Sequence, residues 1–214
     1  MEAVATHRPS WAFLRSKLGS LLAIAPLGVW TAIHLWENLA IFQGRDAWQS
    51  RVTGHAHPVA LVVTSTIVLA PLLFHTVWGI RRLASSRPNN QRYGFFPNLQ
   101  YLLQRLSAVG VLLFLGAHIW HAFLLPRVVQ GHAEPLADIA GEMRHNPPTL
   151  IVYVLGTLGV AYHLANGLNG FAMGWGIAQS RAGLKRVQLT SVLTFLALLA
   201  MSWGAIYGLW VAGA

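Results

Sequence analysis

The sequence predicts an all-α membrane protein with five transmembrane helices, because of its composition, its long apolar runs and the distribution of its basic residues. Of its 214 residues, 55% are hydrophobic and only 10% are charged, and the mean hydropathy is +0.50. Soluble domains carry roughly 25% charged residues, so a large soluble helical core is the weaker interpretation. We expect a single integral membrane domain over residues 1–214.

Five apolar runs are each long enough to cross a bilayer, which takes about 20 apolar residues in a helix. The first run has the length of a full span, so we interpret it as a membrane anchor and not as a signal peptide. Pro71 lies inside the second run, where a kink is expected. The loop over 127–146 is long enough to hold a short helix. The expected spans cover residues about 18–42, 58–83, 99–126, 148–175 and 187–211.

The basic residues predict the orientation. Five crossings place the two termini on opposite sides, and cytoplasmic loops normally carry the excess of Lys and Arg. With the N-terminus inside, the outer side holds only Arg45, Arg51, Arg127 and Arg144. The cytoplasmic side then holds Arg8, Arg15, Lys17, Arg81, Arg82, Arg87, Arg92, Arg105, Arg181, Lys185 and Arg186. Tryptophans expected to act as interfacial anchors near the ends of spans are Trp11, Trp48, Trp175 and Trp210.

Charge and cysteine content exclude several function classes. A net charge of +9 would indicate nucleic-acid binding in a soluble protein, but in a membrane protein it reflects inner loops and anionic lipid headgroups. We therefore expect contact with membrane lipid and none with nucleic acid. The chain has no cysteine, which excludes disulfides, thiolate-bound iron–sulfur clusters and covalent c-type haem in this chain.

Histidines are the main candidates for a functional site. An ionisable side chain inside the membrane is costly and is a functional hypothesis by default. Ten histidines occur, and half of them fall within the expected spans. These are His34 in the first span, His75 in the second, His118 and His121 in the third and His163 in the fourth.

Two of these histidines lie in the outer half of the membrane. At 1.5 Å per residue, His34 lies about 25 Å from Lys17 at the inner face. His118 lies about 20 Å from Arg105 on the same reckoning. They come from two different helices at one depth.

Two others lie in the inner half. His75 is about 9 Å from Arg81, and His163 is about 22 Å from Pro148 at the outer end of its span. Two histidines from two helices at each of two levels is the arrangement that bis-histidine ligation of two stacked b-type haems requires, with one axial nitrogen from each side.

Other uses of these histidines stay open. A lone transmembrane histidine is more often a hydrogen-bonded packing residue, although four at two matched depths favour ligands. A divalent metal site usually takes three or four ligands at one level, often with a carboxylate. A chain of histidines that conducts protons is not excluded by spacing.

Small and basic residues near the histidines have two interpretations each. Glycines such as Gly79 and Gly116 leave room for a porphyrin face, but transmembrane helix packing also favours small residues. Inner-side cations could pair with haem propionates, although positive-inside topology alone would place them there. The candidates for propionate binding are Lys17, Arg82, Arg105 and Lys185.

The chain resembles a known family: the di-haem cytochrome b membrane-anchor subunits of succinate dehydrogenase and fumarate reductase, of the succinate:menaquinone oxidoreductase type. The resemblance covers nearly the whole chain. It is carried by SLLAIAPLGVWTAIHLWEN at 20–38, PLLFHTVWGI at 71–80, YLLQRLSAVGVLLFLGAHIWH at 101–121, YHLANGL at 162–168 and GWGI at 174–177.

The resemblance implies a haem-binding bundle formed by the first four helices and holding two haem b groups. Carried over position by position, His34 and His118 would bind the iron of the outer, distal haem. His75 and His163 would bind the iron of the inner, proximal haem. His121 is left over and is a candidate for a quinone pocket.

The implied reaction is electron transfer from succinate oxidation to a quinone, expected to be menaquinone. A flavoprotein subunit and an iron–sulfur subunit would dock on the cytoplasmic side, at the basic inner loops. This chain would be the non-dehydrogenase subunit, supplying haem electron transfer and the quinone site in a bacterial cytoplasmic membrane. The N-terminus would be cytoplasmic and the C-terminus outside, and the complex could form a higher oligomer.

One position departs from some fumarate-reductase relatives, which carry a glutamate two residues before the fourth-helix ligand, associated with proton movement. That position is Ala161 here, which argues against a proton path at this site. Glu37, near His34, is instead the candidate proton acceptor for quinone chemistry. Two alternative functions remain: a haem b subunit of another membrane oxidoreductase, such as a hydrogenase or formate dehydrogenase, and a haem-free histidine-based proton or metal transporter.

Overall fold

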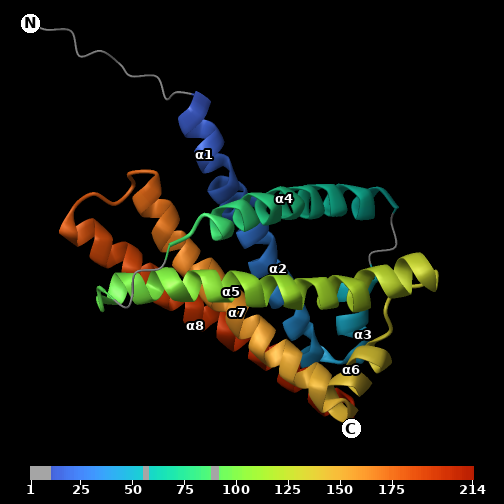
Figure 1. Cartoon of the computed structure of the whole chain (residues 1–214). Coiled ribbons are helices and arrows are strands. Elements are labelled where there is room, and N and C mark those ends of the chain that lie inside the picture. The colour runs from blue at the N-terminus through green and yellow to red at the C-terminus, as the bar shows by residue number, and fades with distance from the viewer. Residues whose placement is uncertain (1–10, 55–57, 88–91) are drawn as a thin grey trace, which may run out of the picture.

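The computed structural model describes residues 11–54, 58–87 and 92–214, and within these ranges every regular element is a helix (Figure 1). The α-helices are α1 Trp11–Leu22, α2 Val29–Asn38, α3 Arg45–Trp48, α4 Pro58–Ala84, α5 Phe96–Ile119, α6 Leu136–His145, α7 Pro147–Gly174 and α8 Arg181–Ala212. The shorter π- and 3-10 segments are η1 Ala23–Gly28, η2 Leu39–Gln43, η3 Gln49–Thr53 and η4 Trp120–Val129.

Within the described residues, five helical stretches are long and apolar enough to cross a membrane, as the sequence predicts. They are Lys17–Gln43, Ser65–Ala84, Phe96–Val129, Pro147–Gly174 and Arg181–Ala212. The short helix expected in the loop over 127–146 is also present, as α6.

Proline residues shape two of the spans. Pro26 lies within η1 and Pro126 within η4, and both segments are π-helical. A proline has no N–H to donate to the preceding turn, and prolines and π-bulges are both sites where helices depart from regular geometry. By contrast, α4 continues as an α-helix through Pro71, and the kink expected there stays a prediction.

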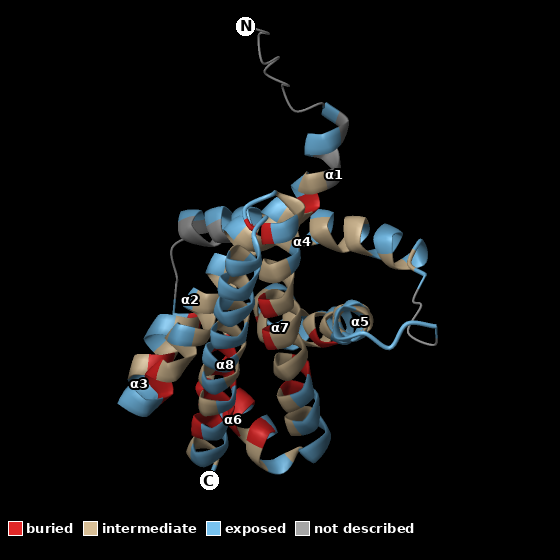
Figure 2. Cartoon of the chain, turned by 90° about the vertical axis from the view of Figure 1, so that its left-hand side faces the viewer, coloured by how far each residue is buried: buried red, intermediate tan, exposed pale blue. Residues whose placement is uncertain are grey.

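α5 and α8 both pack against α7. Both views show α7 and α8 running side by side (Figures 1 and 2), and the Trp203 indole of α8 donates a hydrogen bond to the Val154 carbonyl of α7 at 3.3 Å. α5 packs on α7, where Gly156 leaves room for the ring of Phe114. α4 packs chiefly against α1 and η1 and only slightly against α5.

One end of the bundle is closed by a cap, which consists of α3, η3, α6 and the segment over 133–135. The C-terminal end of α8 lies beside α6 there (Figure 1). The cap contributes to the main buried cluster, which contains Ala40, Ile41, Trp48, Phe114, Leu136, Ile139, Ala140, Met143, Tyr153, Ile206 and Leu209. Figure 2 shows buried positions gathered at this end, whereas much of the remaining helix surface is exposed and apolar. Such a surface suits contact with lipid.

Trp48 does not lie where the sequence predicts. The sequence predicts an interfacial anchor, but Trp48 is only 2% exposed and donates its indole N–H to the Asn38 side-chain oxygen at 3.2 Å. Its role is to pack the cap on α2.

Candidate cofactor site

The long helices enclose a cavity of about 930 Å³, which both predicted histidine pairs line. Its volume lies at the upper end of the range of roughly 300–1,000 Å³ for small-molecule and cofactor sites. The walls come from α1, η1, α2, α4, α5, α7 and α8, and most of the lining side chains are apolar.

The pair nearer the cap is His34 of α2 and His118 of α5, hereafter the distal pair. Their ring centres lie 6.0 Å apart with the ring planes inclined at 60°. Aromatic side chains hold both rings: Trp30 stacks on His34 at 4.7 Å, and Phe114 stacks on His118 at 5.5 Å.

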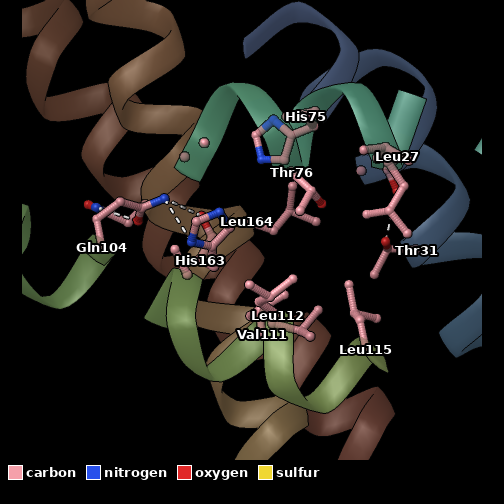
Figure 3. Close-up of a pocket in the computed structure, with 18 of the residues that line it drawn as sticks. Leu27, Thr31, His75, Thr76, Gln104, Val111, Leu112, Leu115, His163 and Leu164 are labelled. Atoms are coloured by element: carbon pink, nitrogen blue, oxygen red, sulfur yellow. Dashed lines mark hydrogen bonds between the residues drawn. The ribbon is translucent and has the colours of Figure 1, made fainter. Parts of the chain in front are cut away.

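The pair at the opposite end is His75 of α4 and His163 of α7, hereafter the proximal pair. Their ring centres lie 6.3 Å apart, with the planes at 68°. Figure 3 shows the two side chains facing the same space, walled by apolar residues such as Val111 and Leu164. The structure therefore brings together the two pairs that the depth argument groups.

Three of the four imidazoles have a hydrogen-bonding partner at Nδ1. This atom lies 3.0 Å from the Gly19 carbonyl oxygen in His75 and 3.1 Å from the Tyr153 hydroxyl in His118. In His163 it lies 3.3 Å from the Ser107 hydroxyl and 3.2 Å from the Gln104 side-chain nitrogen. An oxygen that accepts from Nδ1–H, such as the Gly19 carbonyl or the Tyr153 or Ser107 hydroxyl, fixes the tautomer that leaves Nε2 free as a ligand. The Gln104 amide nitrogen can only donate, and it donates to the His163 backbone carbonyl at 3.0 Å.

His34 is held differently. The Asn38 amide donates to the His34 backbone carbonyl at 2.8 Å, and the same nitrogen lies 3.4 Å from Nε2. The ring orientation here depends on the stacked Trp30 and on this weak contact.

In each histidine pair, the distance between the two ring centres fits one metal ion bound between the rings. A first-row metal ion bound at about 2.0–2.1 Å on both sides separates the nitrogens by about 4 Å, and each ring centre lies roughly 1 Å farther out, which gives about 6 Å. Gly79 and Gly116 line the cavity, and a Cβ on either would meet no atom within 4 Å. In the described part of the chain, no three His, Asp or Glu side chains converge on one point. The apolar walls and the open space at these glycines fit a planar macrocycle between the rings.

Three of the four predicted cations border the cavity near the proximal pair. Lys17, Arg82 and Arg105 line it. The Arg105 guanidinium stacks on Tyr101 at 4.0 Å, and its Nε is buried without a hydrogen-bond partner among the described residues. An unpartnered buried donor suits a carboxylate on a bound group. Lys185, by contrast, is exposed on α8 and does not line the cavity.

The other two predicted residues lie apart from the cavity. His121 is exposed on η4, and Glu37 is partly exposed on α2, one turn from His34; neither lines the cavity. Ala161 is buried, at 1% exposed.

Several residues of the site were not predicted. Tyr153, Ser107 and Gln104 contact the histidines from other helices, and Asn166 donates to the Gln104 side-chain oxygen at 2.8 Å. Asn166 lies three residues after His163, so helical spacing could have placed it near that face. Nothing in the sequence marks the other three.

The fold and the cavity define the class: a multi-pass helical membrane protein with paired histidines between its helices, as in membrane cytochromes b. Within this class, the chain is a homologue of the succinate dehydrogenase cytochrome b558 subunit of Bacillus subtilis (strain 168). The two are 28% identical over 191 residues, which cover 87% of this chain and 91% of that protein. This similarity confirms the family resemblance that the sequence motifs predict. No family model matches the chain, and no solved structure matches it.

Proposed function

We propose that this chain is the cytochrome b membrane-anchor subunit of a succinate:quinone oxidoreductase and conducts electrons through two b haems to a quinone. The observation that carries the proposal is the presence of two facing histidine pairs, 6.0 Å and 6.3 Å apart, at two levels of one cavity. The similarity to a succinate dehydrogenase cytochrome b subunit supports the same conclusion.

Bound haem would supply reversible one-electron chemistry at iron. His34 and His118 would hold one group, and His75 and His163 the other. The oxygens near Nδ1 of His75, His118 and His163 would orient these imidazoles and, by accepting from Nδ1–H, raise their basicity as ligands. The apolar walls exclude water, and Lys17, Arg82 and Arg105 place positive charge where propionates of the proximal group would lie.

The remaining roles follow from the family resemblance. An iron–sulfur subunit, itself bound to a flavoprotein, would dock at the inner loops that carry Arg81, Arg82 and Arg181. This places the N-terminus in the cytoplasm and the distal pair near the outer face. A quinone, expected to be menaquinone, would react near the distal pair, with Glu37 as the proposed proton acceptor and His121 as a residue of the pocket.

The test is a reduced-minus-oxidised spectrum of the purified complex, together with the number of haems per chain. We expect two low-spin b haems, and we expect His34→Ala and His75→Ala each to lose one or convert it to high spin. His145→Ala is the matched control, since this histidine is exposed on α6 and lies outside the cavity.

The outcomes separate the alternatives. Folded, partner-bound protein without haem would overturn the proposal and favour a proton or metal transporter. Two haems in a chain that co-purifies with hydrogenase or formate dehydrogenase subunits would assign it to another oxidoreductase.

A further inference from the structure

The cap holds a buried carboxylic acid that the proposed function does not use. Glu134 lies between η4 and α6 and is only 9% exposed. The Gln49 side chain fixes its backbone: the amide donates to the Glu134 carbonyl at 3.1 Å, and the amide oxygen accepts from the Leu136 N–H at 2.7 Å. No described residue donates a hydrogen bond to the Glu134 carboxylate.

Burial brings the pKa of this acid into the physiological range. Burial, reinforced by the negative charge of Asp138 on α6, raises the pKa of Glu134 to about 7, against the opposing charge of Arg127 on η4. Arg127 itself donates to the Thr53 carbonyl of η3 at 2.7 Å. The other contact from η3 is the neutral Gln49, and His132 is exposed and bonded to its neighbour's carbonyl.

The segment that holds Glu134 packs in the same cluster as the α7 residue that contacts the distal pair. Leu136, two residues after Glu134, and Tyr153 of α7 belong to one buried cluster, and the Tyr153 hydroxyl lies 3.1 Å from Nδ1 of His118. Glu142 is exposed, and its carboxylate accepts hydrogen bonds from Asn146 and Thr149. Glu134, by contrast, is buried, has no described hydrogen-bond donor at its carboxylate and lies two residues before Leu136 of this cluster.

We propose that Glu134 is a proton-exchange site of the distal haem: it takes up one proton from the aqueous phase when that haem gains one electron, and releases it on reoxidation. The inference rests on the proposed function. No covalent bond other than the carboxyl O–H forms or breaks, and the electron comes from the iron–sulfur subunit or, in a titration, from an added reductant. The added negative charge on the haem favours the protonated carboxyl in a low-dielectric site.

The test is a redox titration of both haems in the intact complex at several pH values between about 5 and 9. This range covers both sides of a carboxyl pKa that is raised to near neutrality. In the wild type, the distal midpoint potential should fall as pH rises through neutrality. Glu134→Gln, which keeps the size and removes the ionisation, should abolish most of this shift. Asp46→Asn is the matched control, because Asp46 is an exposed acid in the same cap.

Two further readouts keep the outcomes distinct. The proximal potential is the internal control and should respond little to Glu134→Gln. The reduced-minus-oxidised infrared spectrum should contain a protonated-carboxyl band that Glu134→Gln removes. Two bound haems with an unchanged pH-dependent shift in Glu134→Gln would overturn this inference alone. Absence of haem from the wild type would overturn the proposed function and this inference with it.

Discussion

The Nδ1 atom of His75 on α4 lies 3.0 Å from the carbonyl oxygen of Gly19 on α1. The first span therefore orients a histidine of the second, although α1 contributes no histidine to the cavity. Gly19 is buried, and a Cβ there would overlap the indole of Trp78. Trp78 in turn packs against the His75 ring, with centres 5.8 Å apart. A glycine is thus required for α1 to approach close enough to bind the imidazole.

Gly19→Ala should weaken binding of the proximal haem and leave the distal haem in place. The added methyl group displaces either α1 or Trp78, and both movements disturb the position of His75. We expect haem content to fall from two towards one per chain, with the distal spectrum retained. Gly110→Ala is the control, since Gly110 is exposed and its Cβ would meet no atom within 4 Å. Equal haem content in the two variants would contradict this interpretation.

Gly156→Ala should have the complementary effect at the distal pair. A Cβ at Gly156 would overlap Phe114, the ring that stacks on His118. Overpacking of this kind costs about 1–3 kcal/mol, so thermal stability should fall together with distal haem content. Gly159→Ala, one turn further along α7, is the matched variant, because its Cβ would make an ordinary 3.6 Å contact with Val111. If both variants retain two haems and the same melting temperature, the α5–α7 contact is not a determinant of the site.

Arg105→Gln should lower the midpoint potential of the proximal haem. Reduction adds negative charge, which a nearby guanidinium stabilises, so its removal favours the oxidised form. We expect a downward shift of about 60 mV, equivalent to about 1.4 kcal/mol for a one-electron couple. Arg105→Lys should restore most of it. Lys185→Gln tests the cation that lies outside the cavity and should leave the potential unchanged; a shift there would restore Lys185 as a candidate.

Glu134 should make the stability of the protein depend on pH. Its pKa is raised from 4.5 to about 7 in the folded state, so the folded state binds more protons than the unfolded state between these values, and stability falls as pH rises through this window. Glu134→Gln removes the cost of a buried charge. It should be more stable than the wild type at pH 8, by up to about 3 kcal/mol, and similar to it at pH 4.

Thermal or denaturant unfolding in detergent at the two pH values measures this difference. Because the comparison is between two variants at each pH, the titration of all other groups cancels. A difference that is the same at both pH values would show that the carboxyl titrates normally.

The long-range plan of the molecule could be predicted from sequence because it depends on local properties. Apolar length defines the five spans, and the depth of each histidine follows from its distance along the helix to the nearest membrane end. The pairs His34–His118 and His75–His163 emerge from this arithmetic alone. Their role as iron ligands stays a prediction.

The contacts that orient the histidines depend on how the helices cross, which local sequence does not encode. The Gly19 carbonyl and the Tyr153 hydroxyl become partners only once α1 approaches α4 and α7 approaches α5. Trp48 was misplaced for the same reason, since an aromatic residue near a span end anchors at the interface unless another segment covers it. Here α6 does. The sequence likewise grouped Lys185 with Lys17, because the position of a basic residue along a span predicts its depth in the membrane. It does not predict which face of the helix the side chain occupies.

The sparse packing of α4 against α5 has a consequence for the assembly of the protein in the membrane. With the proposed cofactor bound, the His75 and His163 side chains would join α4 to α7 across the cavity, where α4 touches α5 only slightly and otherwise packs against α1 and η1. The cofactor would then act as a cross-link during biogenesis: α7 and α8 can associate as soon as they are inserted, whereas α4 would be held to α5 and α7 only after the cofactor arrives. Cells starved of haem should therefore accumulate a chain whose second span is loosely held and open to proteolysis.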